Sequence, residues 1–315
     1  MIFTRGLHEV GDGLFAYLQP DGGWGWSNAG LVTASDSSLL VDTLFDLRCA
    51  REMSDALAAV TDGRPIAAAM NTHGNGDHCF GNQLLPHDIP LYATRAADAE
   101  LRAAGPSVVA GLEHVADSPA WQAFWARTFG RFDFDEVELR PPSELFEGRI
   151  DLRVGGRPVT LIEVGPAHTA GDAILHVPDA DVVFTGDILF AQGTPIMWHG
   201  PVANWLAACT TIADLSPKVL VPGHGPISDV SALDSTRRYL TYLHDEARLR
   251  FDAGLDAEAA ADDIDLGEFS DWGDRERIVV NVETLYREFD PTRPAPPPPA
   301  LFVRMAAEWA ARHGA

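Results

Sequence analysis

Four short loops, each containing glycine next to histidine or aspartate, constrain this chain more than any other feature. They are the segments 72–78 (THGNGDH), 165–172 (GPAHTAGD), 185–187 (TGD) and 221–226 (VPGHGP). Each follows a short apolar run that is typical of a strand, so the four loops are expected where strands end. Glycine lets the backbone turn tightly, which allows several side chains to point at one place. The pattern therefore predicts a layered α/β protein whose chemistry lies at strand ends.

The side chains in these loops are those that bind metal ions. Imidazole and carboxylate groups together suit zinc, iron or manganese. The histidines and aspartates of the four loops are His73, Asp77, His78, His168, Asp172, Asp187 and His224, and Asn75 lies among them. The alternative is a set of ordinary loop histidines and turn-forming aspartates. Four such loops in one chain favour the metal site.

Apolar periodicity predicts two β-rich parts, each followed by helices. Strands are expected at 13–18, 29–32, 38–41, 65–70, 151–154, 159–164, 173–177, 182–185 and 219–221. Helices are expected at 46–60, 91–130, 202–214, 228–252, 278–289 and 301–313. We divide the chain into a catalytic domain, 1–245, and an extension, 246–315, with an acidic segment, a helix, a proline-rich linker and a terminal helix. The terminal helix is amphipathic and suits packing on its own domain or on a second copy in a homodimer.

Aromatic residues gather in segment 101–135, which includes Trp125. One interpretation is a helix that packs its apolar face on the core. The other is a helical lid that forms a wall of a pocket for an apolar substrate. Trp24 and Trp26 lie in a glycine-rich loop, and Trp198 and His199 follow the Asp187 loop. These side chains are also candidates for contact with substrate, with packing as the alternative.

The charge of the chain excludes some partners. With 46 acidic and 23 basic residues the net charge is −23, which argues against binding nucleic acid or an anionic membrane. It also disfavours a strongly anionic substrate, unless local charge overrides the total. Segment 252–276 holds ten acidic residues and one basic residue, which is typical of a solvated face or a mobile loop. We therefore expect a small and fairly apolar substrate.

Three widely spaced cysteines form no disulfide framework and no zinc-finger spacing. No apolar run approaches the roughly 18 residues of a membrane-spanning helix. The first residues, MIFTRG, lack the charged start and apolar core of a signal peptide. A cytoplasmic location is the expectation.

In these motifs and their order, the sequence resembles the metallo-β-lactamase superfamily, especially its glyoxalase II-like branch. The resemblance covers residues from about 10 to about 245. It implies a four-layer αββα sandwich with two metal sites at the edge of the paired sheets, followed here by a helical C-terminal extension. It places His73, Asn75 and His168 at a first metal, and Asp77, His78 and His224 at a second, with Asp187 bridging both. It further implies a hydrolase that attacks an ester, thioester, lactone or amide carbonyl with a metal-bound hydroxide.

The chain departs from the family pattern at Asn75, where the family has a histidine. An amide oxygen is a neutral, harder and weaker ligand than imidazole, so the first site is expected to bind zinc less tightly or to accept iron or manganese. The cofactor is then one or two zinc ions, with iron or manganese also possible. His73, His168 and Asp187 also form the two-histidine, one-carboxylate set of non-haem iron oxygenases, which is similar to the persulfide dioxygenase branch. The same fold could also carry a cyclase or lyase, or a metal-free binding protein.

The loops and the resemblance together suggest roles for five residues. Asp77 and Asp187 are expected to be catalytic as well as metal-binding, with Asp77 orienting the nucleophile. Asp42 ends a strand where the superfamily has a structural acid near its site, so we expect it to support the ligands rather than to react. Thr169 and Asp172 are expected to orient His168, although an ordinary turn explains them equally well.

Overall fold

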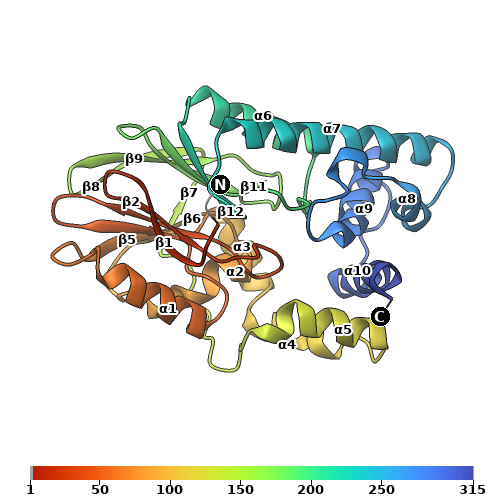
Figure 1. Ribbon diagram of the computed structural model, residues 1–315, viewed down its shortest axis with the longest axis horizontal. Helices are drawn as coiled ribbons and strands as arrows, with labels where there is room; N and C mark the ends of the chain where they lie inside the picture. Colours follow the sequence, from red (N-terminus) through yellow and green to blue (C-terminus); the bar gives the residue numbers. More distant parts are fainter. Residues whose placement is uncertain (1–2, 315) are drawn as a thin grey trace.

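The computed structural model describes residues 3–314. Two β-sheets pack face to face, and helices cover the outer side of each sheet (Figure 1). The predicted α/β sandwich with a helical C-terminal region is confirmed. Within the described residues, no helix combines the length and the apolar character needed to cross a membrane.

The first sheet has seven strands in sequence order. Strands β1 to β4 pair antiparallel, and β4 to β7 pair parallel. Its strands are β1 (Gly6–Gly11), β2 (Leu14–Leu18), β3 (Ala29–Thr33), β4 (Ser38–Val41), β5 (Ile66–Met70), β6 (Leu91–Thr94) and β7 (Glu144–Phe146). The predicted helix over 91–130 is wrong at its start, because pairing with β5 and β7 holds residues 91–94 in a strand.

The second sheet has five strands in the order β12-β11-β10-β9-β8. Strands β8 to β11 pair antiparallel, and β12 runs parallel to β11. Its strands are β8 (Arg149–Val154), β9 (Arg157–Glu163), β10 (Ala173–Val177), β11 (Val182–Phe190) and β12 (Val219–His224). The parallel strand pairs β4–β5 and β11–β12 end in or next to the loops with histidine and aspartate. Because the two sheets pack face to face, these loops come together.

The core between the sheets consists of buried aliphatic and aromatic side chains from both of them. Strand β3 comes so close to β11 that a Cβ on Gly30 would lie 2.3 Å from the ring of Phe184. This close contact explains a glycine in the middle of a buried strand.

Helices form the outer layers and a separate helical region. They are α1 (Leu47–Ala58), α2 (Gly76–Cys79), α3 (Arg95–Ala103), α4 (Pro106–Gly111), α5 (Pro119–Arg127), α6 (Val202–Asp214), α7 (Val230–Asp252), α8 (Ala257–Asp263), α9 (Ile278–Phe289) and α10 (Pro298–His313). Asp46 caps the start of helix α1, because its carboxylate accepts a hydrogen bond from the Cys49 amide at 2.7 Å. Helix α7 runs without a break across residue 245, the boundary expected between the catalytic domain and the extension.

The aromatic segment and the C-terminal helix pack on each other, at the end of the molecule where α8, α9 and α10 gather (Figure 1). Phe302 of α10 lies against Trp24 and Phe129, with ring centroids 5.8 and 5.6 Å apart. The terminal helix thus packs on its own chain, which is one of the two arrangements that its sequence allows.

The acidic segment 252–276 is largely ordered into α8 and short turns rather than a loop. Ala257, Ala260, Ala261 and Ile264 are buried, whereas most of its carboxylates are exposed. The expectation of a solvated face is correct, and that of a mobile loop is wrong, because the apolar side chains between the acids pack against α9.

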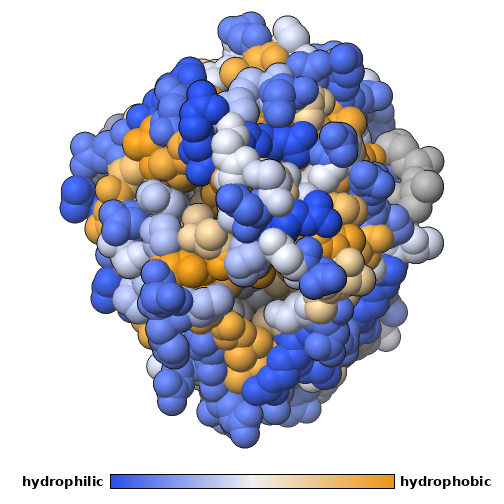
Figure 2. Space-filling model, turned by 90° about the vertical axis from the view of Figure 1, so that its left-hand side faces the viewer, coloured by the Kyte–Doolittle hydropathy of each residue, from blue (hydrophilic) through white to orange (hydrophobic). Residues whose placement is uncertain are grey.

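The opposite end of the sandwich has a mixed surface. Figure 2 shows its hydrophobic residues in several patches that hydrophilic residues separate.

Candidate metal centre

The first group of candidate ligands follows β5. After the strand ends at Met70, Asn75 stands at the start of α2, so Asp77 and His78 fall on its first turn. Gly74 is required just before this helix, because a Cβ there would lie 2.6 Å from the carbonyl oxygen of Ala97.

The second group comes from the other sheet. His168 lies between β9 and β10, Asp187 lies within β11, and His224 ends β12. Gly186 has a φ of 50°, and the β11–β12 register shifts on both sides of it. Such an irregularity turns a side chain out of its alternating direction. It places Asp187 at the centre of the site.

Asp187 is surrounded by the Nε2 atoms of four histidines. Its Oδ2 lies 3.4 Å from His168, 3.5 Å from His224 and 3.8 Å from His73, and its Oδ1 lies 3.2 Å from His78. His224 Nε2 is also 3.3 Å from Asp77 Oδ2. Among the residues that the structure describes, two sets of side chains are close enough to hold an ion: His73, His78 and Asp187, and Asp77, His78 and His224.

The Nδ1 atoms of the same histidines are already engaged with other groups. His168 donates to the Ile196 carbonyl at 2.6 Å, His224 to the Gly22 carbonyl at 3.0 Å, and His78 to Asp42 at 2.8 Å. The hydroxyl of Thr72 gives its proton to Asp42, so it accepts from His73 Nδ1 at 3.1 Å. Each ring is thereby held with Nε2 toward Asp187, and this is the nitrogen that binds a metal once it carries no proton.

Several polar atoms in the centre have no hydrogen-bond partner. His73 Nε2, His78 Nε2 and Asp187 Oδ1 are all buried and unsatisfied within the described residues. Buried polar atoms are rarely left in this way, and their convergence is explained by a cation that they would share. The donor set of imidazole nitrogens and carboxylates fits a divalent metal.

The electrostatics of these side chains point the same way. Burial raises the pKa of Asp187, but the neighbouring imidazoles, His224 first, outweigh burial and hold it well below its ordinary value. Burial also raises the pKa of Asp77, and His78 and His224 bring it down to about 2. Both carboxylates are therefore ionised at neutral pH.

The imidazoles respond in opposite directions. Burial lowers the pKa of His73 well below its ordinary value, and the charge of His78 adds to this. Burial also opposes the charged forms of His78 and His224, but the carboxylates outweigh it and raise the pKa of His224 to about 9. Protons on these two rings balance the carboxylates when no cation does, so metal binding would release protons.

Asp42 lies directly behind the ligands, as expected from its position at the end of a strand. Besides the contact with His78, it accepts the amide and the hydroxyl of Thr72, both at 2.8 Å. Its backbone has a φ of 62°, an unusual conformation for a residue other than glycine. The Asp42 carboxylate thus holds the His78 ring directly and the His73 ring through the hydroxyl of Thr72.

Among the described residues, Asp172 forms hydrogen bonds with the loop of His168 and none with the His168 ring. It accepts hydrogen bonds from the Thr169 amide and hydroxyl and from the Ala167 amide. Burial raises the pKa of Asp172 to about 8, although these donors favour its charged form. The ring itself is held by the carbonyl of Ile196, a partner that the sequence pattern does not reveal.

Asn75 points into the site. Its Nδ2 lies 3.0 Å from His168 Nε2, and that nitrogen accepts because the other ring nitrogen donates to Ile196. The amide thus presents a donor to a candidate ligand. To bind a metal through Oδ1, the side-chain amide would have to rotate.

Replacing Asn75 by histidine is expected to raise zinc affinity at the position formed with His73 and His168 by about 10- to 100-fold. Imidazole is the stronger zinc ligand, and the substitution removes the hydrogen bond that occupies His168 Nε2. Competition with a chromophoric chelator measures the affinity, and Asn75→Ala is the control that removes the amide without adding a ligand. Equal affinity in all three proteins would show that residue 75 does not face the metal.

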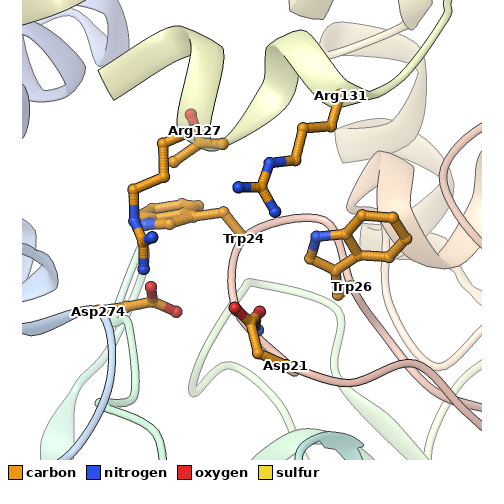
Figure 3. A pocket seen from close by; sticks show the side chains of 8 residues that line it. Asp21, Trp24, Trp26, Arg127, Arg131 and Asp274 are labelled. Atoms are coloured by element: carbon orange, nitrogen blue, oxygen red, sulfur yellow. Dashed lines mark hydrogen bonds between the residues drawn. The ribbon is translucent and has the colours of Figure 1, made fainter. Parts of the chain in front are cut away.

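The aromatic candidates divide into two groups. Trp24 and Trp26 line a pocket, which Figure 3 shows. Trp125 packs on Phe129, and Trp198 packs on Phe302. The amide of Trp198 also donates to the carbonyl of His168, whereas the side chain of His199 is exposed. The structure thus joins Trp24 and Trp198 through Phe302.

Several residues of this region were missed from the sequence. Arg127, Arg131 and Asp274 line the pocket beside Trp24 and Trp26. The two arginines are four positions apart in the aromatic segment, which is a local signal that could have been noticed. No local signal places Asp274 or Phe302 there, because their contacts span more than a hundred residues of chain.

Together, the fold and the centre define a class of α/β proteins that hold metal ions at the edge of two packed sheets. Residues 22–224 match the Metallo-beta-lactamase superfamily. The chain belongs to this superfamily.

Curated relatives support an enzyme of this family. The chain is 27% identical over 217 residues to acyl-coenzyme A thioesterase MBLAC2 of Bos taurus, with 63% of this chain and 72% of that protein covered. It is 35% identical over 82 residues to hydroxyacylglutathione hydrolase of Cereibacter sphaeroides, with 26% and 31% covered. Since its relatives are hydrolases, the chain is a metallo-hydrolase of the superfamily.

Solved structures share the fold. The sec-alkylsulfatase Pisa1 from Pseudomonas sp. matches with a TM-score of 0.68 and 17% identity, over 93% of this chain and 52% of that one. This chain therefore spans about half the length of the sulfatase. The metallo-beta-lactamase FIM-1 from Pseudomonas aeruginosa, in its mono-zinc form, matches with a TM-score of 0.56 and 18% identity, over 76% and 97%.

Proposed function

We propose that this protein hydrolyses an acyl thioester with the help of one or two metal ions, zinc being the first choice. The observation that carries the proposal is the convergence of four Nε2 atoms on Asp187, with buried ligand atoms left unsatisfied. The relatives named as acyl-coenzyme A thioesterase and hydroxyacylglutathione hydrolase favour a thioester among the carbonyl compounds.

The protein's own residues would bind the metal ions and orient water. Metal bound here would polarise the carbonyl and lower the pKa of a coordinated water. His73 and His168, with Asn75, would hold one position, and Asp77, His78 and His224 the other. Asp187 lies beside histidines of both sets and would serve both positions. The side chain of Asp77 is 15% exposed, whereas that of Asp187 is 3% exposed. Asp77 is therefore the carboxylate that faces the substrate and can orient water by accepting a hydrogen bond from it.

The apolar part of the substrate would lie along the aromatic side chains near the site. Trp198 lies next to His168, because the amide of Trp198 donates a hydrogen bond to the His168 carbonyl at 2.9 Å. Its ring contacts Phe302, which in turn contacts Trp24. A fairly apolar acyl group is consistent with this arrangement.

A metal assay followed by a substrate panel tests the proposal. Zinc-loaded protein should release free thiol from acyl-coenzyme A, more rapidly than it opens a β-lactam, and a chelator should remove the activity. Protein that holds at least one equivalent of zinc and cleaves no thioester would contradict the proposal. Iron near one equivalent, together with oxygen uptake on a thiol or persulfide, would favour an oxygenase instead.

A further inference from the structure

The segment 194–200, which follows β11, is bonded to one of the candidate metal ligands. The Ile196 carbonyl accepts the Nδ1–H of the His168 ring at 2.6 Å. The amides of Trp198 and His199 donate to the His168 carbonyl at 2.9 and 3.2 Å. The segment therefore holds both the ring and the backbone of this ligand.

Helix α9 of the C-terminal region holds the same segment from its other side. Asn281 Nδ2 donates to the Pro195 carbonyl at 2.8 Å, and Asn281 Oδ1 accepts the Met197 amide at 2.7 Å. These two bonds fix the residues directly before and after Ile196. One turn further along α9, the hydroxyl of Thr284 donates to the Met197 carbonyl at 2.8 Å. The carbonyl that orients the ligand ring is thus held in place from α9.

The start of the segment is fixed by the turn that precedes α9. The Thr194 amide donates to the Gly273 carbonyl, and Arg277 Nη1 donates to the Thr194 carbonyl, both at 2.9 Å. The side chain of Arg277 is fully buried. The segment is therefore bonded to residues 273–284 along most of its first half, and this part of the chain lies in the helical region of Figure 1.

The Asn281 side chain suits two neighbouring backbone groups. It is 1% exposed, so its polar atoms depend on partners within the protein. Only a side-chain amide offers a donor and an acceptor together, and a backbone carbonyl and a backbone N–H require one of each. The second proton on Nδ2 goes to the Tyr239 hydroxyl at 3.0 Å. An apolar side chain here would leave a buried carbonyl and a buried amide without these bonds, which is costly.

The position of the Ile196 carbonyl affects where the metal-binding nitrogen of His168 lies. The ring is bonded to this carbonyl through Nδ1, while Nε2 lies 3.4 Å from Asp187 Oδ2 and 3.0 Å from Asn75 Nδ2. A ring that is held through one nitrogen presents the other in a fixed direction. A displaced carbonyl would therefore displace Nε2 as well.

We infer that Asn281 is a positioning residue of the metal centre, which fixes the Ile196 carbonyl and, through it, the direction of the His168 ring. Helix α9 is then a part of the centre rather than an appendage to the sandwich. Thr284 supports the same segment through one bond and contributes less. The inference concerns the His168 ring and does not depend on the substrate that the protein hydrolyses.

NMR of metal-free protein with isotope-labelled histidine tests the inference. The Nδ1 protons of His78, His168 and His224 each lie in a buried hydrogen bond and should each give a signal. Asn281→Ala should shift or broaden the His168 signal, which His168→Gln identifies by its absence, and should leave the other two signals in place. Zinc binding at the position that includes His168 should weaken about 10-fold in competition with a chromophoric chelator.

A second buried asparagine provides the matched control. Asn28 Nδ2 donates to the carbonyls of Pro222 and Gly225, on either side of His224, at 2.9 and 2.8 Å. Asn28→Ala thus removes buried bonds of the same kind beside a different ligand. It should leave the His168 signal unchanged, so a general loss of stability is distinguished from a change at one ring.

Thr284→Val keeps the test decisive if Asn281→Ala does not fold. This variant removes one bond to the segment with almost no change of shape, and it should move the His168 signal by a smaller amount. The inference is overturned if all three histidine signals change together, or if the His168 signal stays in place in every folded variant of α9. Absence of thioester hydrolysis in the unaltered protein would refute the proposed function and would not affect these signals.

Discussion

Replacing Asp187 by asparagine is expected to lower thioester hydrolysis by at least about 10³-fold and to leave less than one equivalent of bound metal. The amide has the same shape but no negative charge, and this carboxylate faces the Nε2 atoms of four histidines. Metal assistance supplies several kcal/mol to such a reaction, and each 1.36 kcal/mol corresponds to tenfold in rate. Elemental mass spectrometry and a thiol-release assay measure the two effects together.

The same substitution should not unfold the protein. Without metal, the ionised Asp187 is balanced by protons on neighbouring imidazoles, and the neutral amide removes both charges together. A cooperative melting transition is therefore expected. Turnover and metal content equal to those of the unaltered protein would remove Asp187 from the mechanism.

Replacing Gly223 of β12 by alanine is expected to disrupt the metal centre by displacing Asp187 of the neighbouring strand β11. A Cβ there would lie 1.9 Å from Asp187 Oδ1 and 2.7 Å from the carbonyl carbon of Gly186. Backbone cannot move aside as a flexible side chain can, so either Asp187 is displaced or β12 shifts. We expect a loss of roughly 3 kcal/mol or more in the free energy of unfolding, together with loss of metal.

A nearby glycine provides the control for this experiment. A Cβ on Gly193 would meet only Phe190, at 4.0 Å, so Gly193→Ala should keep both its melting temperature and its metal. Thermal melting with and without added zinc separates the two effects at Gly223. If both alanine variants behave alike, the close contact between β12 and β11 does not hold Asp187 in place.

The loops of the centre could be predicted because each is short and local. A strand followed by glycine, histidine and aspartate carries its own signal, and layers that bring strand ends together do the rest. His73, His78, His168, Asp187 and His224 are thus brought together as their loops predict. Their metal-binding roles stay predictions until the ion is measured.

Other contacts are beyond a sequence pattern because they join distant segments. The partner of the His168 ring is a backbone carbonyl 28 residues away, and any residue type could supply it. Phe302 reaches Trp24 across almost the whole chain. The strand at 91–94 is set by pairing with neighbours rather than by its own residues, which also suit a helix.

The division of the ligands between the two sheets affects the order of assembly. One sheet ends in the segment that holds His73, Asp77 and His78, and the other provides His168, Asp187 and His224. Neither half can offer a full set of donors before the two have joined. Ion uptake should therefore follow folding rather than guide it, and an ion once held acts as a cross-link between halves. Removing the ion with a chelator should then weaken the contact between the two sheets first. Faster hydrogen exchange of backbone amides in β5 and β11 would detect this.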